Sequence, residues 1–142
     1  MSHKTLARDG FDVIGIETRA SNADSAPIGA LWGRFFGDPQ MQQLDAVEDY
    51  PVALYCEYES DHTKPYTFFL GRQVAPGADV PAGLVKRHVP AGSYTLFLAD
   101  GEQPAKLIET WGSVWETPLE RRYDVDYEIH RSDRLVEIYV GV

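Results

Sequence analysis

A tryptophan–glycine pair occurs twice in this chain in matching surroundings, and this repeat constrains the fold more than any other feature. The pairs begin at Trp32 and Trp111, 79 positions apart, and a second large aromatic residue, Phe36 or Trp115, follows each tryptophan by four positions. On a helix these positions share a face, so each pair forms one aromatic ridge. A glycine inside a helix costs about 1 kcal/mol relative to alanine, and close packing of each helix on a sheet would explain its recurrence. The sequence therefore predicts two similar halves with a cleft between them.

The expected order of secondary-structure elements repeats in the same way. The first half reads as strand, helix and hairpin, at residues 11–19, about 26–36, 52–59 and 66–74. A connector at 76–83 leads to a second half of hairpin, helix and hairpin, at 84–89, 93–98, 103–116, 123–130 and 135–140. The fold class is therefore α+β, with duplicated strand–helix–strand–strand units in a single domain of residues 1–142. Residues 1–10 are expected to form a flexible N-terminal segment.

Charge and composition exclude several classes of function. A net charge of −9 argues against direct nucleic acid binding, which needs clustered Lys and Arg, and favours cationic partners. Apolar runs are far shorter than the roughly 20 residues of a membrane span, and no signal-peptide pattern follows the N-terminus. With Cys56 as the single cysteine, the simple expectation is a cytoplasmic protein without membrane contact.

The last expected strand carries the most informative small pattern. Val136, Ile138 and Val140 alternate onto one face, while Glu137 and Tyr139 lie on the other. If the second face lines a pocket, Glu137 would meet a cationic or hydrogen-bonding ligand and Tyr139 would supply a ring face. The alternative is an exposed glutamate on a half-solvated strand.

The preceding strand alternates cleanly between acidic and apolar residues. Asp124, Asp126 and Glu128 share one face, and Tyr127 and Ile129 lie on the other, which favours an arrangement with the acidic face exposed. These carboxylates lack the spacing and glycine of a calcium-binding loop, and the four histidines lack zinc-ligand spacing. Neither a metal nor another cofactor is therefore expected. Cys56 in mid-strand is expected to be a buried hydrophobic residue rather than a nucleophile.

Aromatic residues are abundant on the expected elements, and some tyrosines alternate onto the less apolar face. A buried tyrosine needs a hydrogen-bond partner for its hydroxyl. An aromatic box around a carboxylate is a physically sound receptor for a lipophilic cation, because the rings supply area and quadrupole while the carboxylate compensates the charge.

Several degenerate motifs follow one another along about residues 11–142: Ile14-Gly15-Ile16-Glu17-Thr18, Ile28-x-x-Leu31-Trp32, residues 54–60, residues 66–71, residues 89–97 and Val136-Glu137-Ile138-Tyr139-Val140. In this order they resemble the GyrI-like effector-binding domains, which also form the ligand-binding part of AraC-type transcription regulators. The chain looks most like the stand-alone branch that includes integron-cassette proteins binding cationic drugs.

This resemblance implies a pseudo-twofold axis relating the two units, antiparallel sheets with two main helices, and a central ligand groove. It also implies an acidic ligand-binding residue in the last strand, which falls on Glu137. Aromatic pocket residues are implied near Tyr94, Trp111 and Tyr139. We add two residues to complete the expected ligand-binding set, Tyr55 and Glu128. The family usually ends this strand with Ile-Pro-Val, whereas this chain has Val140-Gly141-Val142.

Three functional hypotheses follow from the pattern and the resemblance. The first is a binding protein for small hydrophobic, cationic effectors of the multidrug type. The second is a hydrolase of strained cyclopropane-bearing electrophiles, with Glu137 as general base and Tyr94 as acid or orienting group. The third is a module that modulates a partner protein. A homodimer stays open, and binding is favoured over enzymatic activity.

Overall fold

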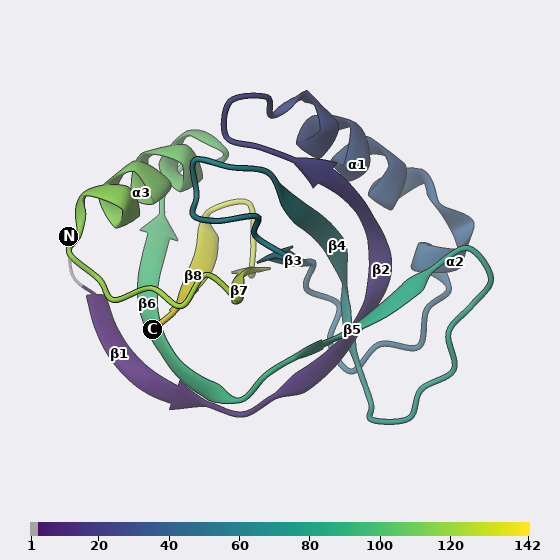
Figure 1. Cartoon of the computed structure of the whole chain (residues 1–142). Coiled ribbons are helices and arrows are strands. Elements are labelled where there is room, and N and C mark those ends of the chain that lie inside the picture. Colours follow the sequence, from purple (N-terminus) through teal and green to yellow (C-terminus); the bar gives the residue numbers. More distant parts are fainter. Residues whose placement is uncertain (1–2) are drawn as a thin grey trace.

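The computed structural model describes residues 3–142 and shows a single eight-stranded antiparallel sheet with three helices (Figure 1). The strands of the first half are β1 (His3–Arg8), β2 (Phe11–Ala20), β3 (Val52–Cys56) and β4 (Tyr66–Val74). Those of the second half are β5 (Val85–Val89), β6 (Gly92–Asp100), β7 (Val125–His130) and β8 (Leu135–Gly141). The helices are α1 (Ala26–Gly37), the short α2 (Pro39–Gln42) and α3 (Ala105–Glu116). The expected α+β class is confirmed.

The order of strands in the sheet shows that the two halves have the same build. The sheet runs β1-β6-β8-β7-β3-β4-β2-β5, so β3-β4-β2 on one side corresponds to β7-β8-β6 on the other. The halves meet where β3 pairs with β7, and we call this pair the seam. The strands met from one edge, β1-β6-β8-β7, correspond one by one to those met from the other edge, β5-β2-β4-β3. A twofold axis through the seam requires this correspondence.

The N-terminal segment was expected to be flexible, and the structure corrects this. Residues 1 and 2 lie outside the described part of the chain, but His3–Arg8 forms β1 and pairs with β6. The hydroxyl groups of Thr5 and Thr95 lie 2.8 Å apart across this pair. Because β1 is an edge strand with mostly exposed side chains, its sequence lacks the alternation that identifies a half-buried strand.

The expected hairpin of residues 84–98 is also wrong. The structure pairs β5 with β2, with Val13 opposite Arg87, and pairs β6 with β1 and β8. Pro90-Ala91 is therefore a connection between strands with different partners, although its composition suggests a reversing turn. Each half thus begins with a strand that pairs with the other half: β1 joins β6, and β5 joins β2.

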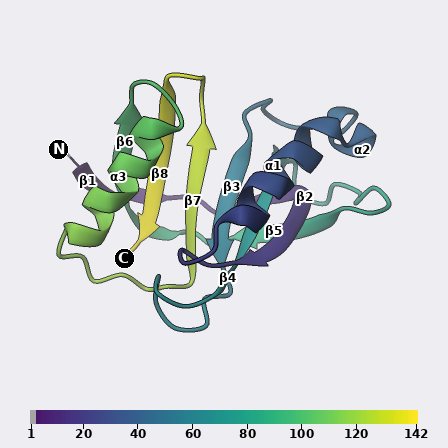
Figure 2. The ribbon, with the colours of Figure 1, turned by 90° about the horizontal axis from the view of Figure 1, so that it is seen from above.

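The two long helices lie over one face of the sheet and leave the seam between them (Figure 2). On this face α1 packs over β2 and β4 through Leu31 and Phe35, and α3 packs over β6 and β8 through Val114. The opposite face has its own core, which includes Leu54, Phe69, Tyr94, Tyr127 and Tyr139. Both faces of the central strands are therefore buried.

The helical glycines do not have the role expected of them. A Cβ atom on Gly33 or Gly112 would meet nothing within 4 Å, so close packing on the sheet does not explain either residue. The close approach occurs between strands instead, because a Cβ atom on Gly71 would lie 2.3 Å from the carbonyl oxygen of Ile14. The aromatic ridges do form, with ring centroids 5.8 Å apart for Trp32 and Phe36.

Candidate functional site

A cleft of about 490 Å³ lies over the seam, between α1 and α3. Ile28, Gly29 and Trp32 of α1 form one wall, and Leu107, Ile108, Trp111 and Trp115 of α3 form the other. Tyr55 of β3, Tyr66 of β4 and Glu128 of β7 line its sheet side. This volume is in the range of small-molecule sites, and the position between two helices is a common one for them.

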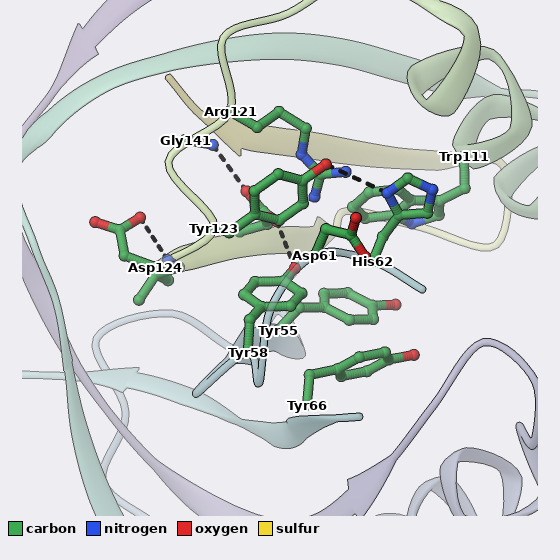
Figure 3. A network of polar contacts seen from close by, with 12 residues as sticks. Tyr55, Tyr58, Asp61, His62, Tyr66, Trp111, Arg121, Tyr123, Asp124 and Gly141 are labelled. Atoms are coloured by element: carbon green, nitrogen blue, oxygen red, sulfur yellow. Dashed lines mark hydrogen bonds and ion pairs between the residues drawn. The ribbon is translucent and has the colours of Figure 1, made fainter. Parts of the chain in front are cut away.

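Aromatic rings dominate the surface of the cleft. The ring centroid of Tyr55 lies 5.2 Å from that of Trp111 and 5.5 Å from that of Tyr66. Tyr58 continues this series, 5.7 Å from Tyr66. In Figure 3 the rings of Tyr55, Tyr58 and Tyr66 lie one beside another in the site. The cleft therefore offers ring faces and edges from both halves of the fold, which suits a flat or aromatic ligand.

The Glu128 carboxylate lies at the sheet side of the cleft and is 1% exposed. Its Oε2 accepts hydrogen bonds from the Tyr55 hydroxyl and from Trp111 Nε1, both at 2.7 Å. Its Oε1 lies 2.8 Å from His130 Nε2. Tyrosine and tryptophan are neutral donors, and an imidazole adds a positive charge only when it is protonated. Among residues 3–142, no Lys or Arg forms an ion pair with Glu128.

The charge of Glu128 acts on its neighbours. Burial raises the pKa of the Tyr55 hydroxyl well above its ordinary value, and the nearby Glu128 charge and its hydrogen bond add to that rise. Burial likewise raises the pKa of Tyr66 to about 12, with Glu128 as the second cause. Both hydroxyl groups therefore stay protonated as donors throughout the physiological range.

A second buried carboxylate, Asp126, lies two residues before Glu128 on the same face of β7 and is fully buried. One of its oxygens accepts a hydrogen bond from the backbone N–H of Gly141 at 2.8 Å. The other accepts from the Tyr58 hydroxyl and from Nη2 of Arg121, the latter at 2.6 Å. Asp126 is thus neutralised by Arg121, whereas Glu128 has no such partner in the part of the chain that the structure describes.

Three of the six expected ligand-binding residues line the cleft, namely Tyr55, Trp111 and Glu128, and three do not. Glu137, Tyr139 and Tyr94 are absent from its lining and lie on the face of the sheet away from the helices. Nε and Nη2 of Arg131 contact Glu137 at 3.0 Å. The Tyr139 hydroxyl donates to the same carboxylate, also at 3.0 Å.

Strand alternation explains this outcome. On β8 the helix-covered positions are Ile138 and Val140, which pack under α3, so Glu137 must point the other way. On β7 the helix-covered positions are Asp126 and Glu128, which are buried and not exposed as their alternation suggested. The pair expected for the hydrolase hypothesis is not assembled either, because the Tyr94 hydroxyl donates to the carbonyl oxygen of Pro90 at 2.7 Å.

Sequence reasoning missed several residues of the site. Trp32 lines the cleft as Trp111 does, although only Trp111 was expected to touch a ligand. The ring of His130 lies 4.9 Å from that of Trp32 and also contacts Glu128. Tyr58 lies within the motif at residues 54–60, but that motif gave it no role in the site, and Arg121 comes from a segment without a motif. The repeat of Trp32 and Trp111 was the available signal for Trp32; no pattern in the sequence indicated a role for His130, Arg121 or Tyr58 in the site.

Neither a metal-binding cluster nor a membrane-spanning helix occurs among the described residues. Within residues 3–142 no three His, Cys, Asp or Glu side chains are grouped so that they could hold a metal ion. Across the same part of the chain, no helix has the length and apolar character needed to cross a membrane.

The chain matches a known protein family over almost its whole length. Residues 6–142 match the Cass2 family, described as integron-associated effector binding protein. The chain therefore belongs to this family. It is also 29% identical over 135 residues to the transcriptional regulator BrlR of Pseudomonas aeruginosa, covering 92% of this chain and 48% of BrlR. The chain thus spans about half the length of that relative.

Solved structures show the same fold. The integron cassette protein VCH_CASS2 from the mobile metagenome of Vibrio cholerae is 32% identical, with a TM-score of 0.83 over 99% of this chain and 95% of that one. The structure of SAV2435 bound to tetraphenylphosphonium is 16% identical, with a TM-score of 0.78 over 99% and 93% of the two chains. The second likeness concerns the fold alone.

Proposed function

We propose that this member of the integron-associated effector-binding family binds an amphipathic organic cation in the cleft between α1 and α3. The observation that carries the proposal is Glu128, a buried carboxylate on the sheet side of an aromatic cleft, held by neutral donors and by His130. Glu128 takes the charge of the ligand, and Tyr55, Trp32 and Trp111 take its apolar surface.

The energetic argument rests on desolvation. A buried carboxylate is costly unless an opposite charge lies close to it, and a cation bound in the cleft supplies that charge. A cation with bulky organic substituents is weakly hydrated, so it loses little when it leaves water. Ring faces attract a cation through their quadrupole, with Trp the strongest of the three aromatic types. A hydrophobic cation therefore gains from both features of the cleft, whereas an anion of the same shape is repelled by Glu128.

The acidity of the whole chain supports the same class of ligand. A net charge of −9 raises the local concentration of cations near the surface and speeds their encounter with the cleft. The relatives support it too, because the family is described as effector-binding and SAV2435 has been seen with tetraphenylphosphonium. Effector binding and a regulatory role, as in BrlR, would be linked if the ligand changed how the chain contacts a partner.

The decisive experiment compares two ions of nearly the same shape and opposite charge. Tetraphenylphosphonium and tetraphenylborate are titrated into the protein, and binding is followed by tryptophan fluorescence and calorimetry. We expect saturable binding of the phosphonium only. Glu128→Gln should weaken it by about 30-fold or more, since the partner of a buried charge is lost.

Glu137→Gln is the matched control, because Glu137 lies on the opposite face and is already paired with Arg131. It should leave phosphonium affinity unchanged. Equal binding of the two ions, or equal loss in the two variants, would disprove a cation site at Glu128.

A further inference from the structure

Arg121 carries donor groups that the fold itself does not use. Its side chain is 6% exposed, lines the cleft and pairs with Asp126 through Nη2 at 2.6 Å. Its Nε and Nη1 are buried and have no hydrogen-bond partner among residues 3–142. Unpartnered buried donors of a charged group are rare and costly in folded proteins, so their position beside a cleft calls for a ligand group that satisfies them.

The neighbouring ring does not meet this need. Tyr123 stacks on the guanidinium, with the central carbon 4.3 Å from the ring centroid. It adopts a left-handed backbone conformation with φ of 56°, a region that non-glycine residues seldom occupy. Stacking covers a face of the guanidinium, whereas its N–H bonds lie in its plane. Figure 3 shows the guanidinium of Arg121 beside the ring of Tyr123.

We propose that the ligand carries, besides its cationic centre, an uncharged oxygen acceptor such as a ketone or amide carbonyl, and that Nε and Nη1 of Arg121 bind it. This inference rests on the proposed function and adds a second recognition group to it. Arg121 acts as a specificity determinant for the chemical class of the cation.

The balance of charges in the cleft explains why the acceptor should be uncharged. Arg121 and Asp126 neutralise each other, and a monocation neutralises Glu128, so all formal charges in the cleft are then balanced. A ligand carboxylate would add an unbalanced buried anion near Asp126 and Glu128, which is costly. A carbonyl oxygen accepts from Arg121 without changing this balance.

The geometry also limits the spacing between the two ligand groups. Asp126, which holds Arg121, and Glu128 are neighbours on the same face of one strand. Such positions lie roughly 6.6–6.8 Å apart along the strand. The cationic centre and the oxygen are therefore expected to be separated by a short linker of a few bonds.

The test uses pairs of triphenylphosphonium probes that differ in a single group. One member ends in a methyl ketone on a linker of two to five methylenes, and the other replaces the ketone C=O by C=CH₂. At the best linker length we expect the ketone to bind about tenfold more tightly, because a charged donor gains a partner. A third probe, ending in a carboxylate, should bind more weakly than the ketone.

The double variant Arg121→Met/Asp126→Asn removes the donors and the buried ion pair together, and the substituted amide retains an oxygen for the Gly141 N–H. The ketone preference should vanish in it, while the alkene probe still binds. Unmodified protein gives an independent readout: the Nε–H resonance of Arg121, assigned from an Arg121→Lys spectrum, should shift with the ketone and not with the alkene. This measurement does not depend on the double variant folding.

Equal affinity of ketone and alkene at every linker length would overturn the inference, as would an Nε–H resonance that responds to both alike. A carboxylate that binds better than the ketone would overturn the uncharged acceptor. Failure of the alkene probe to bind, or binding that ignores Glu128→Gln, disproves the cation site itself, and the inference falls with it.

Discussion

The Tyr55 hydroxyl donates a 2.7 Å hydrogen bond to Oε2 of Glu128 across the seam, and these two residues occupy equivalent positions in the two halves. The offset between Trp32 and Trp111, carried through the strand registers of each half, makes Leu54 equivalent to Tyr127, which lies opposite it in the β3–β7 pair. A twofold axis between these two residues exchanges the next ones, Tyr55 and Glu128. One half thus presents a phenol and the other a carboxylate at the same place. The cleft is symmetric in build and asymmetric in charge.

Loss of the Tyr55 hydroxyl should destabilise the free protein. Tyr55→Phe leaves a buried charged acceptor with one donor fewer, so we expect the free energy of unfolding to fall by about 1.5–3 kcal/mol. Tyr66→Phe is the control, because its hydroxyl donates to the neutral side-chain oxygen of Asn22, and it should cost about 0.5–1.5 kcal/mol. Urea unfolding of both variants measures the difference, and a larger loss for Tyr66→Phe would contradict it.

Alkaline pH should weaken the fold through its buried tyrosines. Burial raises the pKa of Tyr66 and Tyr127 to about 12 and that of Tyr55 and Tyr58 well above its ordinary value. Above pH ~10 the unfolded chain ionises these groups while the folded chain keeps their protons. Stability is therefore complete below pH ~10 and falls as pH rises, by about 1.4 kcal/mol per pH unit for each such tyrosine.

Urea unfolding between pH 9 and pH 12 measures this loss, and tyrosinate absorbance of the folded protein measures the ionisation directly. We expect part of the absorbance change to be delayed until the protein unfolds. A single transition of all eight tyrosines near pH 10 would contradict the predicted burial effect.

The Arg121–Asp126 pair should contribute strongly to stability. Asp126→Ala leaves the Arg121 charge buried and unpaired and frees the Gly141 N–H and the Tyr58 hydroxyl. We expect a loss of about 3–5 kcal/mol in the free energy of unfolding. Glu109→Ala removes an exposed ion pair with Lys106 and should change it by no more than about 0.5 kcal/mol. Thermal and urea unfolding would contradict the prediction if the two variants were equally stable.

Two glycine substitutions should have opposite signs. Gly33→Ala places a methyl group where nothing lies within 4 Å and should stabilise α1 by about 0.5–1 kcal/mol. Gly71→Ala would bring the methyl group 2.3 Å from the Ile14 carbonyl oxygen and should destabilise the β2–β4 pair by at least about 3 kcal/mol. Denaturant unfolding tests both predictions: the midpoint should rise for Gly33→Ala and fall for Gly71→Ala, with the denaturant dependence of the unfolding free energy unchanged. A Gly71→Ala variant as stable as the unmodified protein would contradict the close approach.

Local pattern was enough to predict most elements of the fold. The apolar, β-branched and aromatic residues of β2 and β4, the alternation in β8 and the apolar spacing of α3 placed these elements within a few residues of their observed bounds. Which strand pairs with which depends on long-range contacts. The hairpin expected around Pro90 failed because its turn-like composition carries no information about the partner of β5, which is β2.

The site was harder to predict because a strand pattern shows which residues share a face and not what covers that face. Glu137 and Glu128 both alternate with apolar neighbours, so the sequence alone treats them alike. Only the position of α1 and α3, on either side of the seam, decides that Glu128 faces the cleft. Tyr55 and Trp111 were predictable as aromatic residues, whereas Arg121 lies in a segment without regular structure.

The exchange of β1 and β5 between the halves has a consequence for cutting the chain. Each fragment made by a break in the loop before β5 would lack an edge strand that the other fragment carries. Neither fragment would be a complete folding unit, yet together they hold every strand and both cleft walls. The fold is thus suited to a split protein whose two fragments form the cleft again only when they reassociate. A ligand that contacts both Trp32 and Trp111 would favour the reassociated form, and its binding would report that the fragments have joined.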